Sequence, residues 1–149
     1  MSDWTHVAGV VVLGTYDFHS FNAKNLPTKE EAVQKIKDYI GPLSPFSVYN
    51  YGMKLPKGSE GPLSYDVHMN DSNREAVIII TIFGDLRDFS YPNQVIKWFF
   101  STFNEEALSA ADIVPHIHSA VLTAENDYSR EQHSIVWQRG LNRYNNFVK

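Results

Sequence analysis

The chain has 149 residues, of which 43% are hydrophobic and 13% aromatic, a length and composition typical of one domain with one core. It contains no cysteine, which excludes a disulfide framework, a thiolate metal site and a cysteine nucleophile. Because its formal net charge is -4, the chain lacks the positive field that drives general nucleic-acid binding.

The amino-acid sequence also shows neither a membrane-spanning segment nor an export signal. The longest apolar run, Ala76–Phe83, is far shorter than the ~20 residues of a membrane-spanning helix. The first residues show neither the basic stretch nor the long apolar core of an export signal. We therefore expect residues 1–149 to form a single domain that works in a reducing cytoplasm.

In chain order, the first predicted element is a buried strand over Val7–Tyr16, which is rich in valine. A helix is predicted over Lys29–Ile40, where apolar residues recur at helical spacing. Thr28 and Glu31 form a capping box at its start, and Gly41-Pro42 provides an exit that cannot continue the helix. This segment carries the most complete set of helix signals in the chain.

Prolines and glycines then make regular structure improbable over most of residues 41–62, apart from a short strand at Phe46–Tyr51. A loop of this length in a small domain is typical of a functional surface. Ser64–Met69 alternates as a half-buried strand does, and Ala76–Phe83 is the most hydrophobic segment of the chain. We predict that Ala76–Phe83 is the central strand and pairs antiparallel with Ser64–Met69.

The last third of the chain predicts a second helix over Asn93–Ala107 and two strands over Ile113–Thr123 and Gln132–Trp137. Pro115 confines the first of these strands to a sheet edge or a bulge. Residues 138–149 are predicted to be a frayed, flexible tail. The inward stripe of the helix is predicted to consist of Ile96, Phe99, Phe100 and Phe103.

The predicted order is strand, helix, strand, strand, helix, strand, strand. This order is typical of a ferredoxin-like α+β sandwich, a split βαβ arrangement with two helices on one face of a mainly antiparallel sheet. One extra C-terminal strand would be added here. The same elements in a different strand order are the alternative.

A glycine-rich segment, Lys57-Gly58-Ser59-Glu60-Gly61, precedes the alternating strand. Glycine permits positive φ, so successive backbone N–H groups can turn inward as an anion nest while Lys57 adds positive charge. The phosphate-loop pattern is absent, and no helix follows. A tight connector is therefore the alternative interpretation.

Asp85, Arg87 and Asp88 follow the predicted central strand, a common position for side chains that meet a ligand. Arg87 can hold a phosphate or carboxylate through two parallel hydrogen bonds, and the aspartates can bind ribose hydroxyls or a divalent cation. A local ion pair near the start of the second helix is the other interpretation. We expect this segment and residues 57–61 to meet on one concave surface that tolerates anions.

His116 and His118 are predicted to project from the same face of a strand, a spacing suited to metal binding or proton transfer. With Asp85 they form the alternative catalytic set. The common hydrolase and dinucleotide motifs are absent, and no histidine is followed two residues later by Ser or Thr, as two-histidine phosphoesterases require. We therefore expect binding and not catalysis, with no metal and no cofactor.

Three segments of the chain form a recognisable set: Trp4–Val10, the motif GSEGxLxY at Gly58–Tyr65, and the motif IFGDLRD at Ile82–Asp88, which a tryptophan-containing helix follows. In these segments the chain resembles a family of uncharacterised small proteins of tailed bacteriophages and prophages. The resemblance implies a setting, a phage product in the cytoplasm of an infected bacterium. It implies no activity and no site residues.

This setting and the candidate residues lead to three functional hypotheses. The first is a non-enzymatic binding protein that counters host defence by sequestering a nucleotide-derived immune signal, a small anionic ligand, at residues 57–61 and at Asp85, Arg87 and Asp88. The second is an inhibitor that binds a host protein directly. The third is a small metal-dependent phosphodiesterase or hydrolase. We also expect a homodimer, and neither a membrane nor a general nucleic-acid partner.

Overall fold

The computed structural model of the chain describes residues 2–14, 29–40, 55–71, 76–110, 116–138 and 141–148. The strands are β1 (Trp4–Gly14), β2 (Lys57–Gly58), β3 (Gly61–Pro62), β4 (Ser64–Asp71), β5 (Ala76–Arg87), β6 (His116–Asn126), β7 (Glu131–Gln138) and β8 (Leu141–Val148), and the helices are α1 (Lys29–Ile40), α3 (Pro92–Thr102) and α4 (Glu105–Ala110).

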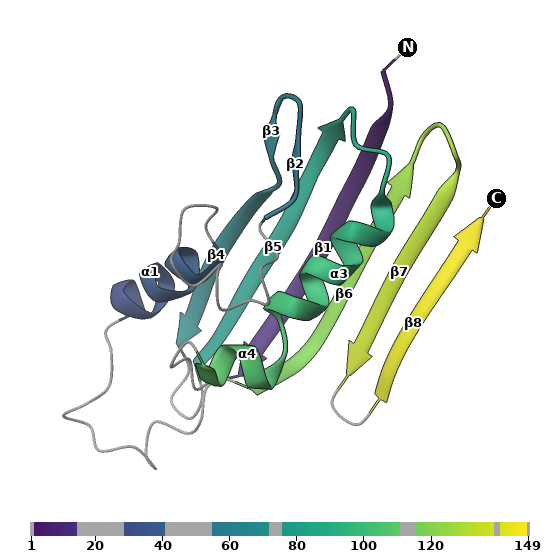
Figure 1. The fold of residues 1–149 in the computed structure, drawn as a ribbon. Coiled ribbons are helices and arrows are strands. Elements are labelled where there is room, and N and C mark those ends of the chain that lie inside the picture. Colours follow the sequence, from purple (N-terminus) through teal and green to yellow (C-terminus); the bar gives the residue numbers. More distant parts are fainter. Residues whose placement is uncertain are drawn as a thin grey trace.

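The fold is mixed α+β, with a six-stranded sheet of order β4-β5-β1-β6-β7-β8 in which every neighbouring pair is antiparallel. The helices lie on one face of this sheet, and the β2–β3 hairpin stands beside the end of β5 (Figure 1). Both layers contribute to one core, in which Trp98 of α3 and Ile80 of β5 are fully buried. The predicted α+β class and mainly antiparallel sheet are therefore confirmed.

The two faces of the sheet differ in what covers them. Val7 and Val11 of β1 point toward the helices and are buried, whereas Val10 between them is exposed on the opposite, open face. Val10 lies opposite Val121 of β6, and Val121 lies opposite Val136 of β7. An exposed apolar row therefore crosses three neighbouring strands of the open face.

The predicted pairing of Ser64–Met69 with Ala76–Phe83 is confirmed, since β4 and β5 are antiparallel neighbours. The predicted end of the central strand at Phe83 is wrong. β5 continues to Arg87, because Gly84–Arg87 pairs with Trp4–Val7 of β1. Asp85 and Arg87 therefore project from a strand and not from a loop.

The predicted helix over Lys29–Ile40 is confirmed with the same bounds. The predicted helix over Asn93–Ala107 is in fact two helices, because the Asn104 side chain interrupts it. The Asn104 amide donates hydrogen bonds to the carbonyls of Phe100 and Ser101, and its Oδ1 accepts one from the backbone N–H of Ala107. Asparagine commonly competes with helical backbone bonds in this way.

The inward stripe of the second helix also differs from its prediction at one position. Phe99 is buried, but Phe100 is 43% exposed and Trp98 is buried instead. Trp98 packs edge-on against Phe103, with ring centroids 5.9 Å apart. The aromatic side of this helix is therefore turned so that one ring of the predicted stripe faces solvent.

At the C-terminal end, β6 and β7 correspond to the two predicted strands, but two strands and not one extend the sheet beyond β6. β6 is an internal strand that starts just after Pro115, and its register with β1 shifts between Val12 and Leu13. Leu141–Val148 forms β8 against β7, within the segment predicted to be a tail. The predicted strand at Phe46–Tyr51 lies outside the described residues.

Among the helices that the structure describes, none has the length and apolar character needed to cross a membrane.

Candidate functional site

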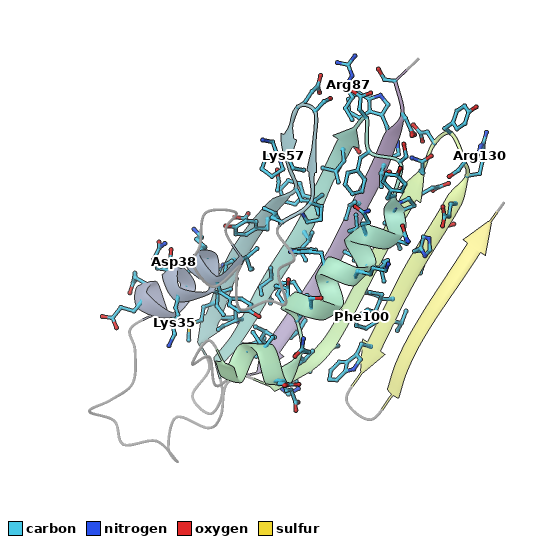
Figure 2. The ribbon with its side chains drawn as sticks, in the orientation of Figure 1. Lys35, Asp38, Lys57, Arg87, Phe100 and Arg130 are labelled. Carbon is cyan, nitrogen blue, oxygen red and sulfur yellow. The ribbon has the colours of Figure 1, made fainter. Side chains whose placement is uncertain are left out.

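The two segments predicted to form a site do meet. The Ser59 N–H donates a 2.8 Å hydrogen bond to the carbonyl of Arg87, and the Ser59 hydroxyl donates one of 2.8 Å to Asp88 Oδ2. A Cβ atom on Gly58 would lie 2.7 Å from both the N and the O of Arg87, so the hairpin can approach β5 this closely only with glycine there. Figure 2 shows Arg87 near the tip of the hairpin and Lys57 farther down it.

Within this contact, Arg87 already has partners inside the chain. Its Nη1 donates to Glu60 Oε1 at 2.9 Å, and its Nε donates to Ser2 Oγ at 3.1 Å. The guanidinium carbon also lies 5.9 Å from the centroid of the Trp4 ring. An anionic ligand would have to compete with Glu60 for Arg87, whereas Lys57 is exposed.

Asp85, the remaining residue of the predicted site, faces His6 across the β1–β5 pair. His6 Nδ1 lies 2.5 Å from Asp85 Oδ1, and His6 Nε2 lies 2.9 Å from Asp127 Oδ1. Since both ring nitrogens face carboxylate oxygens, the geometry favours the doubly protonated imidazolium. The hydrogen bond to Asp85, followed by the one to Asp127, raises the pKa of His6 above its usual value of 6.5. The cluster ties β1 to β5 and to the β6–β7 turn.

We expect this cluster to make stability depend on pH. A histidine whose pKa is raised by folding stabilises the fold fully below its unfolded pKa, and the contribution is lost as pH rises through the folded pKa. Urea unfolding should therefore show a fall in the free energy of unfolding as pH increases above 6.5, and His6→Gln should flatten this fall. His68→Gln, a change at an exposed histidine of β4, should keep it. Identical pH profiles for wild type and His6→Gln would contradict the assignment.

Asp85 lies far from the two histidines of the alternative catalytic set. Asp85 pairs with His6 near the start of β1, whereas His116 pairs with Gly14 at its end. At about 3.3 Å per residue of strand, roughly 26 Å separate the two ends. His118 lies at the register shift beside His116. Within the described ranges, no group of three or more His, Asp or Glu side chains could hold a metal ion.

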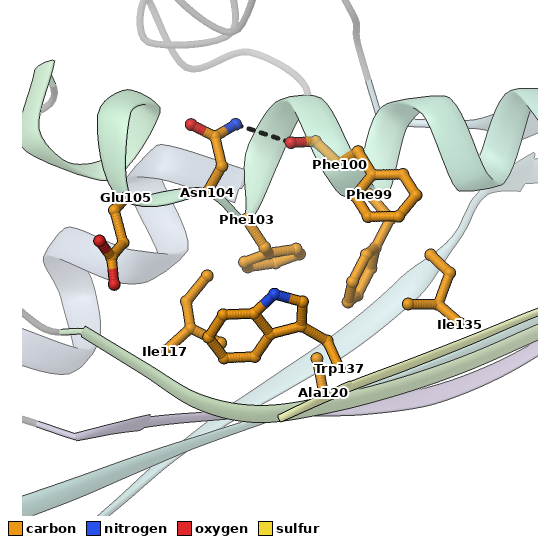
Figure 3. Close-up of a pocket in the computed structure, with 9 residues that line it drawn as sticks. All are labelled: Phe99, Phe100, Phe103, Asn104, Glu105, Ile117, Ala120, Ile135 and Trp137. Atoms are coloured by element: carbon orange, nitrogen blue, oxygen red, sulfur yellow. Dashed lines mark hydrogen bonds between the residues drawn. The ribbon is translucent and has the colours of Figure 1, made fainter. Parts of the chain in front are cut away.

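A second candidate site, which we call the aromatic pocket, lies between the α3–α4 junction and strands β6 and β7. Its volume is about 270 Å³. Its floor is buried core, and its rim includes the exposed ring of Phe100 and the half-buried indole of Trp137 (Figure 3). The pocket is lined by Phe99, Phe100, Phe103, Asn104, Glu105, Ile117, Ala120, Ile135 and Trp137.

Sequence reasoning assigns these aromatic residues to the core or to an interface, but it does not identify a pocket among them. Helical spacing alone does not reveal that the helix ends at Thr102 and that Phe100 faces outward. The usable signs were Asn104, which favours helix ends, and the small Ala120 on the opposing strand.

No family model, no curated protein and no solved structure matches this chain, so the two candidate sites are interpreted from their own geometry.

Proposed function

We propose that this protein works by binding and not by catalysis, and that it inhibits a host protein by holding a segment of it in the aromatic pocket. The observation that carries this proposal is a solvent-open pocket whose buried floor is flanked by Phe100 and Trp137. Aromatic side chains around a desolvated pocket are typical of the few residues that dominate the affinity of protein interfaces. The resemblance to phage proteins implies an infected bacterium as the setting, and the partner is then a protein of that bacterium.

The surroundings of the pocket support a protein partner over a phosphate-bearing ligand. Glu105 lines the pocket, and Glu106 lines a shallower hollow beside it. The whole chain is also acidic, with a net charge of -4. These negative charges repel phosphates and favour partners with basic or neutral surfaces.

We expect substitution of the exposed ring to weaken partner binding without unfolding the protein. Immobilised wild type should retain a specific partner from a bacterial lysate, and Phe100→Ala should weaken that interaction by about tenfold or more, the size of effect seen at interface anchor residues. Val121→Ser, on the open face of the sheet away from the pocket, is the matched control and should retain the partner. Equal capture by wild type and Phe100→Ala would exclude the aromatic pocket as the binding site.

A second candidate is sequestration of a nucleotide-derived immune signal at the contact between the hairpin and β5. It is favoured by the meeting of residues 57–61 with Arg87 and Asp88 and by the exposed ammonium group of Lys57. The phosphates would have to displace Glu60 from Arg87. A thermal shift with cyclic or ADP-ribose-type nucleotides that Lys57→Ala removes, with the nucleotide recovered intact after denaturation, would favour this candidate over partner binding.

We infer further that β1, α1, β4, β5, α3 and β6 make up a ferredoxin-like unit to which β7 and β8 are added. The order β4-β5-β1-β6, with all pairs antiparallel, supports this assignment. So does the position of a helix after β1 and another after β5.

A further inference from the structure

The aromatic pocket combines aromatic rings with a negative charge. Four of its lining residues are aromatic, and Figure 3 shows Glu105 at the end of the pocket away from Ile135. None of the nine lining residues is a lysine, arginine or histidine. Because the face of an aromatic ring carries partial negative charge, the walls and the carboxylate attract the same kind of ligand.

The polar groups of the pocket differ in whether they are free to meet a ligand. Asn104 is engaged, since its amide donates to the carbonyls of Phe100 and Ser101 and its Oδ1 caps α4 by accepting the N–H of Ala107 at 2.8 Å. The Glu105 carboxylate is exposed and has no hydrogen-bond or ion-pair partner within the part of the chain that the structure describes. The hydrogen-bond acceptor that remains available to a ligand is therefore the negatively charged carboxylate of Glu105.

The neighbouring hollow extends this character along the surface. It has a volume of about 490 Å³ and is lined by Phe100, Ser101, Asn104 and Glu106, so it shares Phe100 and Asn104 with the pocket. A chain segment whose side chain enters the pocket can therefore continue along a second surface that also carries a carboxylate. An anionic segment would meet both Glu105 and Glu106.

We propose that the aromatic pocket binds an organic cation, the ammonium or guanidinium end of a basic side chain on the partner segment. This inference rests on the proposed function of partner binding. The alkyl stem of such a side chain packs on the apolar floor, and its charged end lies over the ring faces beside Glu105. A volume of about 270 Å³ is just below the usual range of small-molecule sites, as expected for a pocket that takes one side chain.

The test compares two probes of the same shape, choline and its uncharged analogue 3,3-dimethylbutan-1-ol, in NMR titrations that follow the indole N–H signal of Trp137. We expect choline to bind, and the alcohol to bind about threefold to tenfold more weakly, the range that a cation–π contact and one exposed carboxylate provide. Glu105→Gln should weaken choline and leave the alcohol unchanged. Phe100→Leu, which keeps apolar volume but removes the ring, should do the same, whereas Glu30→Gln on α1 should change neither.

The outcomes separate this inference from the proposed function. Equal affinity for the two probes overturns the cation preference, while a partner interaction that depends on Phe100 still supports the function. Selective choline binding in a protein whose partner capture is unaffected by Phe100→Ala overturns the function and leaves the cation site in place. An indole signal that responds to neither probe overturns the site itself.

Discussion

Asn126→Ala should destabilise the protein by about 3–4 kcal/mol, which corresponds to a fall in Tm on the order of 10 °C for a domain of this size. Asn126 is 1% exposed and stands at the end of β6. Its Nδ2 donates to Asp3 Oδ1, to Thr5 Oγ1 and to the carbonyl of Phe89, at 2.7–3.1 Å. Truncation removes the shared donor of these acceptors, of which Thr5 is buried and Asp3 and Phe89 are half-buried.

The other end of the same amide shapes the turn into β7. Asn126 Oδ1 accepts hydrogen bonds from the backbone N–H groups of Tyr128 and Ser129, at 3.0 and 2.9 Å. Asparagine commonly holds a turn by bonding to the backbone two or three residues later. One side chain therefore joins the N-terminal segment, the segment after β5 and the β6–β7 turn, and its loss affects all three.

Thermal and urea unfolding of three variants would check this prediction. Asn70→Ala, at an exposed position of β4, is the matched control and should stay within about 0.5 kcal/mol of wild type. Asn126→Asp keeps the acceptor for the turn but removes the donor and places a second carboxylate beside Asp3, so it should also be strongly destabilised. A cost below about 1 kcal/mol for Asn126→Ala would show that water replaces the network.

Gly9→Ala should destabilise the protein by about 2–3 kcal/mol, although alanine is ordinarily favoured over glycine inside a strand. An added Cβ would lie 2.5 Å from Leu122 Cδ1 and 2.6 Å from the backbone oxygen of Val121. Gly9 is opposite Leu122 in the β1–β6 pair, on the face that the helices cover. The leucine can move aside, but the carbonyl is held by the sheet, so the strand itself has to shift.

A double-mutant cycle would identify the cause. Gly9→Ala should cost less in a Leu122→Ala background, because one of the two clashes is then gone, but the clash with the Val121 carbonyl should keep the cost above zero. Ala8→Val, on the exposed face of the same strand, is the control and should be nearly neutral. If Gly9→Ala increased the free energy of unfolding, β1 and β6 would have to lie farther apart than described.

Much of the fold could be predicted because it depends on patterns local in the sequence. The helix Lys29–Ile40 has its apolar residues on one side and its stop directly after it, and its bounds are confirmed. The β4–β5 pair follows from alternation, a turn and a continuous apolar run. The central strand was predicted to end at Phe83, which was wrong, because pairing with Trp4–Val7 extends β5 through Gly84 to Arg87. That pairing joins residues nearly 80 positions apart, a partner that no local pattern identifies.

For the candidate sites, residue types could be recognised but their partners could not. Arg87 is a plausible anion ligand in any sequence, and only the tertiary structure places Glu60 and Ser2 against it. No sequence pattern marks His6 as a site residue, yet the fold places its ring between Asp85 and Asp127. Phe100 belongs to an aromatic stripe that periodicity assigns to the core. Whether it is buried depends on where the helix ends and how it turns against β6 and β7.

The amino-acid sequence by itself therefore determined the α+β class and the positions of the main strands and first helix. These features follow from backbone preferences and hydrophobic periodicity, which act over a few residues. Only the tertiary structure decided which charges neutralise each other and which aromatic rings remain exposed. Those outcomes depend on distances between segments far apart in the chain, because contacts of cations with ring faces act within about 6 Å and interactions between exposed charges are screened beyond about 10 Å.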